Sequence, residues 1–262
     1  MKTSFYKYQG AGNDFIMVDN RNLEFKASTA LIAKLCNRRF GIGADGLILL
    51  ENEVENSVDF KMVYYNSDGN ESTLCGNGGR CIVAFAKQLG IIQKSCHFMA
   101  IDGLHQAHFE AELVSLSMPD VHLIQSYHSE SFYLNTGSPH HVDFLSSIAG
   151  LDVQKEGARI RNSNLYGKAG SNINFVEVQD NFMKIRTYER GVEDETLACG
   201  TGVTAAAIAA HFAKKITGNE VAVQAIGGDL AVRFLLQNQV YTHIELVGPA
   251  KFVFKGEIEC EA

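Results

Sequence analysis

The sequence lacks any long run of apolar residues. None of its apolar stretches approaches the roughly 20 residues that a membrane-spanning helix needs. The amino-terminal segment MKTSFYKYQGAGNDF also lacks the apolar core of a secretion signal, so we expect no such leader there. These features predict a cytoplasmic protein with no membrane partner.

Basic residues are scarce, with 23 Lys and Arg against 30 Asp and Glu and a net charge of −7. An acidic chain is repelled by nucleic-acid phosphates, so we expect no nucleic-acid partner. Six cysteines in 262 residues are too sparse for a disulfide scaffold. A chain of this length can bury a sufficient core without cross-links, and we expect reduced thiols.

Prolines are also few, and short runs rich in β-branched and aromatic residues predict strands in both halves. A helix is predicted over about 28–38, where a Ser/Thr cap candidate precedes spaced apolar positions. The predicted strands are residues 15–19, 46–51, 59–66 and 111–118 in the first half and 173–178, 182–189, 230–236 and 241–248 in the second.

One pattern occurs twice: TLCGNGG at 73–79 and TLACGTG at 196–202. Each places a cysteine before a glycine-rich turn that leads into a helix of small apolar residues, which is typical of a helix buried on all sides. The repeat predicts an α+β fold with two similar domains related by duplication. Each domain is expected to have strands wrapped around a central helix. We place the first domain at 1–117, with a returning strand at 251–262, and the second at 118–250.

The segment GIGADG at 41–46 matches the G-x-G-x-x-G pattern of dinucleotide-binding loops. That pattern binds pyrophosphate when a strand precedes it and a helix follows it. Here a predicted helix precedes it and a predicted strand follows it, so we expect no nucleotide. Cys75 and Cys81 are not accompanied by a C-x-x-C or H-x₃-H pair, so we expect no metal and no thioredoxin-like redox site.

Cys75 and Cys199 are therefore interpreted as acid/base thiols. A helix amino terminus stabilises a thiolate, and uncovered glycine amides can hold a carboxylate beside the sulfur. A single thiol would suit a cysteine hydrolase, and two could instead form a regulatory disulfide. Two equivalent thiols, however, suit a racemase or epimerase, in which one removes a proton from a carbon and the other returns one to its opposite face.

The chain resembles the diaminopimelate epimerase family nearly end to end. The resemblance implies that each domain is a mixed sheet or barrel wrapped around its central helix, with the active site in the cleft between the domains. The resemblance implies interconversion of LL- and meso-2,6-diaminoheptanedioate without a cofactor, in lysine and cell-wall precursor synthesis, often by a homodimer. The matching motifs are GAGNDF (10–15), GIGADGL (41–47), YYNSDGNESTLCGNGGRC (64–81), NTGSPHHV (135–142), SNINFVEV (171–178) and YERGVEDETLACGTG (188–202).

The resemblance also implies roles for individual residues. Cys75 and Cys199 match the two catalytic thiols, and His140 and Glu189 match groups that adjust the thiol pKa values. Arg190 suits the distal carboxylate, because its planar guanidinium presents paired donors. The remaining positions match substrate-binding residues of two kinds: Gly76, Asn77, Gly200 and Thr201, whose backbone holds the reacting carboxylate, and Asn13, Asn66, Asn172 and Glu189, which bind the rest of the substrate.

Two positions depart from the pattern of some family members: Gly46 replaces a substrate-contacting Gln, and Ser138 replaces an Asn. The alternative function is that of another two-cysteine enzyme, such as a proline racemase, whose substrate lacks a second charged end. The other polar and thiol positions are expected to be structural, namely Cys36, Cys81, Cys96, Cys260 and Asn174.

Overall fold

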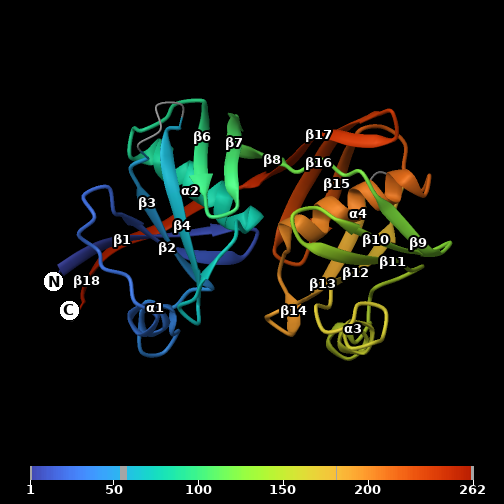
Figure 1. Ribbon diagram of the computed structural model, residues 1–262, viewed down its shortest axis with the longest axis horizontal. Helices are drawn as coiled ribbons and strands as arrows, with labels where there is room; N and C mark the ends of the chain where they lie inside the picture. Colours follow the sequence, from blue (N-terminus) through green and yellow to red (C-terminus); the bar gives the residue numbers. More distant parts are fainter. Residues whose placement is uncertain (1, 54–57, 181, 261–262) are drawn as a thin grey trace. The chain divides into compact units, whose positions relative to one another are not determined.

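The computed structural model describes residues 2–53, 58–180 and 182–260. The chain divides into two compact units, Met1–Leu116 with Pro249–Ala262, and Ser117–Gly248 (Figure 1). Each is a mixed β-sheet with two helices among its described residues. None of the helices in the described part of the chain is both long and apolar enough to span a membrane.

The first unit contains one sheet in which neighbouring strands follow the order β18-β1-β2-β3-β4-β6-β7-β8. The β2–β3 and β4–β6 pairs are parallel, the other pairs are antiparallel, and β5 adds a short pairing to β4. The elements are β1 (Lys2–Gly10), β2 (Asn13–Asp19), α1 (Thr29–Cys36), β3 (Gly46–Glu51), β4 (Phe60–Asn66), β5 (Glu71–Ser72), α2 (Gly76–Gln88), β6 (Ser95–Ala100), β7 (Gly103–Glu110), β8 (Leu113–Met118) and β18 (Lys251–Glu259).

The second unit repeats this topology with the order β9-β10-β11-β12-β13-β15-β16-β17. The β11–β12 and β13–β15 pairs are parallel, at the same two places in the sheet, so the predicted duplication is confirmed. The elements are β9 (Ile124–His128), β10 (Ser131–Asn135), β11 (Pro139–Phe144), α3 (Val153–Arg161), β12 (Asn172–Val178), β13 (Met183–Glu189), β14 (Asp194–Thr196), α4 (Gly200–Phe212), β15 (Glu220–Ala225), β16 (Gly228–Gln237) and β17 (Val240–Pro249).

All eight predicted strands are present as β2, β3, β4, β8, β12, β13, β16 and β17. The predicted helix is α1, and the Ser28 side chain accepts a hydrogen bond from the backbone N–H of Leu31 at 3.3 Å, as a capping residue does. The segment after residue 250 forms β18 and pairs with β1. The elements not predicted from the sequence are β1, β5, β6, β7, β9, β10, β11, β14, β15 and α3.

The helices that follow the two cysteines are the central helices that the sequence predicts. Helix α2 packs against β1, β2, β3 and β18, and α4 packs against β10, β11, β12, β13, β15 and β16. In α4 the stretch from Ala205 to Ala210 is completely buried. Side chains of this size allow strands to approach the helix closely from several directions, which explains the small residues.

The loop at 41–46 joins α1 to β3, so a helix precedes it and a strand follows it. This is the reverse of the order that binds dinucleotides, as expected from the sequence.

Replacing Ala207 with Leu should overpack the second unit, because Ala207 is completely buried in α4. We expect the free energy of unfolding to fall by about 1–3 kcal/mol, measured by denaturant titration. The matched control is Ala30→Leu on the exposed side of α1, which should change stability by less than about 0.5 kcal/mol. Equal effects of the two substitutions would contradict close packing around α4.

Candidate active site

Cys75 is the residue that immediately precedes α2, in extended backbone conformation, and its carbonyl accepts the N–H of Gly79 at 2.7 Å. Its side chain makes no capping hydrogen bond to the helix. The first amides of α2 are therefore not capped by the sulfur, and with the helix dipole they favour a negative group near this end. Gly76 and Asn77 form the start of this turn and are buried.

Cys199 holds the same position before α4. Its backbone is also extended, its carbonyl accepts the N–H of Val203 at 2.9 Å, and its side chain makes no capping hydrogen bond to the helix. Gly200 and Thr201 begin the helix. The duplicated sequence motif thus produces the same local structure twice, with a thiol at the amino-terminal end of a central helix in each unit.

Glycines in both turns permit close packing against a neighbouring strand. A Cβ on Gly78 would lie 3.0 Å from Ile48 Cδ1, and a Cβ on Gly202 would lie 2.4 Å from Asn174 Oδ1. Ile48 and Asn174 are the third residues of β3 and β12, which are equivalent strands. The glycines therefore let each helix end approach its sheet, but the side chain that they meet is apolar in one unit and polar in the other.

In the first unit, the Asn13 amide is held in one orientation beside Cys75. Asn13 Nδ2 donates to Asp45 Oδ2 at 2.6 Å, which leaves Oδ1 to accept from Cys75 Sγ at 3.5 Å and from Asn77 Nδ2 at 3.3 Å. The buried Arg80 guanidinium donates to Asn77 Oδ1 at 2.8 Å and so fixes that amide as well. The structure therefore brings Asn13, Cys75 and Asn77 together.

Asp45 belongs to a charged cluster that was not predicted from the sequence. Arg38 Nη2 lies 2.7 Å from Asp45 Oδ1 and 2.6 Å from Asp14 Oδ1, and Lys7 Nζ lies 2.7 Å from Asp14 Oδ2. Burial by itself raises the pKa of Asp14, but hydrogen bonds from Arg38 and Lys7 outweigh it and lower the pKa to about 2. The GIGADG loop therefore supplies a carboxylate that orients Asn13.

In the second unit, Cys199 contacts the Thr201 hydroxyl, which in turn contacts the His140 imidazole. Thr201 Oγ1 lies 3.4 Å from Cys199 Sγ and 2.9 Å from His140 Nε2. His140 is completely buried in β11, and burial, with a smaller effect from the positive charge of Arg190, lowers its pKa to about 3. His140 is therefore a neutral imidazole at physiological pH.

His140 also contacts a residue that the sequence reasoning assigned to structure alone. Asn174 Nδ2 lies 3.2 Å from His140 Nδ1, and both side chains are completely buried. The sequence does contain a signal for this contact: Asn174 is a polar residue in the apolar run INFVEV. A buried polar side chain needs a hydrogen-bond partner.

Asn172 and Arg190 form a second group of contacts in this unit. Asn172 Oδ1 accepts the backbone N–H of Arg190 at 2.9 Å, and its Nδ2 donates to the Pro139 carbonyl at 3.1 Å. These bonds give Asn172 a structural role in joining the ends of β11 and β13. The exposed Arg190 side chain donates to the Ala169 carbonyl at 3.1 Å, and Glu189 is the last residue of β13.

Asn66 is the last residue of β4 and pairs with Gly46 in β3. A Cβ on Gly46 would lie 2.6 Å from both the Tyr64 ring and the Tyr65 carbonyl, so the space that a glutamine would need is occupied. Ser138 lies in the turn before β11, where its carbonyl accepts the N–H of Thr136. The Gly46 departure therefore has a packing cause.

Three other thiols are buried hydrophobic groups. Burial raises the pKa values of Cys36, Cys81 and Cys96 to about 12, so these thiols are protonated at neutral pH. No disulfide is formed by any of the six cysteines, all of which lie in the described part of the chain.

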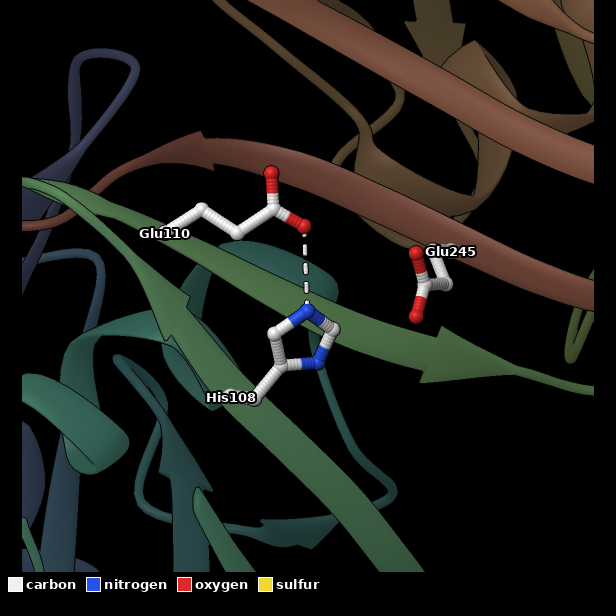
Figure 2. A group of neighbouring side chains, drawn as sticks. All are labelled: His108, Glu110 and Glu245. Carbon is white, nitrogen blue, oxygen red and sulfur yellow. Dashed lines mark hydrogen bonds and ion pairs between the residues drawn. The ribbon is translucent and has the colours of Figure 1, made fainter. Parts of the chain in front are cut away.

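Strand β7 carries a histidine–carboxylate pair, with His108 Nε2 3.0 Å from Glu110 Oε1 (Figure 2). Two ligand atoms are fewer than the four of a structural zinc site, so we interpret the pair as a hydrogen bond on a half-buried strand. Glu245, which Figure 2 also draws, belongs to β17 of the second unit.

Comparisons with known proteins agree with the duplicated topology. The family model described as diaminopimelate epimerase matches residues 5–113 and 132–253. The chain is 59% identical over 256 residues to a diaminopimelate epimerase from Flavobacterium psychrophilum, covering 97% of this chain and 99% of the relative.

Two solved structures share the fold at low sequence identity. A phenazine biosynthesis protein of the PhzF family from Bacillus anthracis is 14% identical with a TM-score of 0.75, covering 99% of this chain and 100% of that one. A hydroxyproline epimerase from Agrobacterium vitis is 12% identical with a TM-score of 0.72, covering 98% of this chain and 92% of that one. At these identities the likeness concerns the fold alone.

The charged cluster around Asp14 should make stability depend on pH in acid. Because the pKa of Asp14 is lowered from its ordinary value of 3.8 to about 2, its contribution is present above about pH 4 and is lost as the pH falls toward 2. We expect the difference in unfolding free energy between the native chain and Asp14→Asn to shrink over this range, measured by urea titration at each pH. The exposed Asp229→Asn control should show a small, pH-independent difference. A constant difference for Asp14→Asn would contradict the assigned pairing.

Proposed function

We propose, since this chain belongs to the diaminopimelate epimerase family, that it is an isomerase that interconverts LL- and meso-2,6-diaminoheptanedioate by moving the α-proton between two cysteines. The observation that carries the proposal is the repeated thiol at the amino-terminal end of a central helix, once in each unit. The duplication provides two acid/base groups of the same kind, which suits a two-base inversion at one carbon.

The proposed chemistry uses Cys75 and Cys199 in alternating roles. The thiolate of one cysteine accepts the α-proton from one face, and the thiol of the other donates a proton to the opposite face. The two sulfurs exchange protonation states in each turnover and exchange roles in the reverse reaction. Negative charge develops on the substrate as the proton leaves, so donors that are already in place lower the barrier.

Backbone amides at the two helix ends are proposed to bind the reacting carboxylate. Gly76, Asn77, Gly200 and Thr201 lie in the first turns of α2 and α4, where amide dipoles favour an anion.

The rest of the substrate is assigned to a second set of residues. Arg190 is proposed to bind the distal carboxylate, since its side chain is exposed and its guanidinium can donate two parallel hydrogen bonds. The remaining members of the set are Asn13, Asn66, Asn172 and Glu189. Asn13 has an oriented amide beside Cys75, whereas the Asn172 amide already bonds Arg190 and Pro139.

His140 and Glu189 are proposed to adjust the thiol pKa values. His140 reaches Cys199 through the Thr201 hydroxyl and not by direct contact. We further propose that the enzyme works without a cofactor, as a cytoplasmic homodimer, in lysine and cell-wall precursor biosynthesis. The two units are proposed to be the two domains expected at 1–117 with 251–262 and at 118–250.

Incubation with LL-diaminopimelate in deuterated water should place solvent deuterium at the inverted α-carbon, detected by mass spectrometry and NMR. Cys75→Ala and Cys199→Ala should each lower the epimerisation rate by at least about 10³-fold, because each removes one of two obligatory proton carriers. Circular dichroism should show that both variants are folded.

The matched control is Cys96→Ala, which removes a buried thiol of the first unit and should retain epimerisation. Full turnover by either active-site variant would contradict the two-thiol mechanism. Turnover of proline or hydroxyproline, with diaminopimelate left unchanged, would replace the proposed function with that of a proline racemase.

A further inference from the structure

We infer that Asn174 is a positioning residue for Cys199: its amide fixes His140 in the tautomer that carries the proton on Nε2, and this turns the Thr201 hydroxyl toward the Cys199 sulfur. The consequence for catalysis rests on the proposed function. The arrangement itself rests on contacts within the second unit.

The orientation of the Asn174 amide is set by the His141 carbonyl, and the Thr187 hydroxyl adapts to it. Its Nδ2 donates to the His141 carbonyl at 2.7 Å, and a carbonyl can only accept. Its Oδ1 accepts from Thr187 Oγ1 at 3.0 Å. The atom that faces His140 Nδ1 at 3.2 Å is therefore the amide nitrogen, which can only donate.

This orientation determines where His140 carries its proton. A ring nitrogen that accepts a hydrogen bond has no hydrogen, so neutral His140 has its proton on Nε2. Nε2 lies 2.9 Å from Thr201 Oγ1 and donates to it. The Thr201 hydroxyl hydrogen is then available for Cys199 Sγ, 3.4 Å away. The hydrogen bonds run in one direction, from Asn174 through His140 and Thr201 to the sulfur.

Burial strengthens this directionality. His140 and Asn174 are completely buried and Thr187 is 3% exposed, so little solvent is present to satisfy a reversed arrangement. The lowered pKa of His140 keeps the ring neutral, so a single proton has to be placed on one of two nitrogens. Gly202 is also part of the arrangement, since a Cβ there would lie 2.4 Å from Asn174 Oδ1.

The first unit shows that the fold does not require this polar chain. His140 pairs with the first residue of β12, and Phe15 pairs with the first residue of β3. Asn174 is the third residue of β12, and Ile48 is the third residue of β3. Phe15 and Ile48 are completely buried apolar residues, so a stable sheet forms without an imidazole or an amide at these positions. The polar pair is therefore specific to the Cys199 side.

The chemical effect is to present a hydrogen-bond donor to Cys199. A donated hydrogen bond stabilises the thiolate more than the thiol and thus raises the thiolate fraction. An Asn174 variant should change the reactivity of Cys199 without removing any group that touches the substrate.

The first test is ¹⁵N NMR of histidine-labelled protein without substrate. The native protein should show a non-protonated Nδ1 and a protonated Nε2 for His140, assigned by comparison with His140→Gln. Asn174→Asp should reverse this pattern, because a carboxylate accepts from Nδ1–H. Asn174→Leu, of similar size and without a donor, should give a mixture of tautomers. Thr187→Val is the matched control: it removes a buried hydrogen bond to Asn174 Oδ1 and should lower stability while leaving the tautomer unchanged.

The second test measures alkylation of Cys199 by iodoacetamide at neutral pH, followed by peptide mass spectrometry. Asn174→Leu and Thr201→Val should each slow alkylation about tenfold, as expected for loss of a hydrogen bond to a charged group. The double variant should be no slower than either single variant, because both substitutions interrupt the same chain of contacts. With diaminopimelate, Asn174→Leu should lower kcat and leave KM nearly unchanged.

A native His140 protonated on Nδ1, additive effects of Asn174→Leu and Thr201→Val, or an equal slowing by Thr187→Val would each overturn the inference. Neither the NMR nor the alkylation measurement uses substrate. Expected results in both, together with no turnover of diaminopimelate, would leave the inference standing and refute the proposed function. Normal epimerisation by a protein whose His140 carries its proton on Nδ1 would refute the inference and leave the proposed function standing.

Discussion

Each unit depends on packing a helix among strands that contact it from several directions. In α4 this requires small side chains along most of the helix, and in both helices it requires glycine where the first turn meets the sheet. Because most of α4 is enclosed, its amino-terminal turn is where this helix can offer backbone amides to a bound group. Close packing and chemistry therefore share the same few residues, and the motifs TLCGNGG and TLACGTG satisfy both requirements.

The two halves repeat the thiol but not its surroundings. Cys75 faces an amide oxygen that is fixed by a carboxylate, which belongs to a cluster of four charged side chains. Cys199 faces a hydroxyl that is supported by a neutral imidazole. An amide oxygen accepts from a thiol, whereas a hydroxyl can donate to a thiolate. Duplication thus produced two equivalent backbones, and substitutions on the neighbouring strands made the two thiols chemically different.

The sequence was sufficient to predict the elements whose residues carry a strong apolar pattern. The run GLILLE is buried along nearly all of β3 and was predicted, whereas GLHQAHFE in β7 mixes polar and apolar residues, buries only Ala107, and was not predicted. Helix α3 was missed for a similar reason, since VQKEGARIR buries only Val153, Gly157 and Ile160. Patterns that depend on apolar periodicity do not identify elements that are polar over most of their surface.

The candidate site was predictable where one motif supplies neighbouring residues, as with Cys75, Gly76 and Asn77. It was not predictable where the contact depends on strand register. His140 and Asn174 meet because β11 and β12 pair in parallel, and Asp45 meets Asn13 because β2 and β3 do the same. Parallel pairing joins residues that are far apart in the chain, and no local pattern specifies which residues will face each other.

Because of strand β18, the two units have all their strands at different points in the synthesis of the chain. The second unit is continuous in sequence, and its edge strand β9 directly precedes β10, so all its strands exist once its last residue has been synthesised. The corresponding strand of the first unit is β18, which follows the whole second unit in the chain. The first unit therefore cannot complete its sheet until β18 has been synthesised, after the whole second unit. The unit whose synthesis begins first is thus the last to have all its strands available.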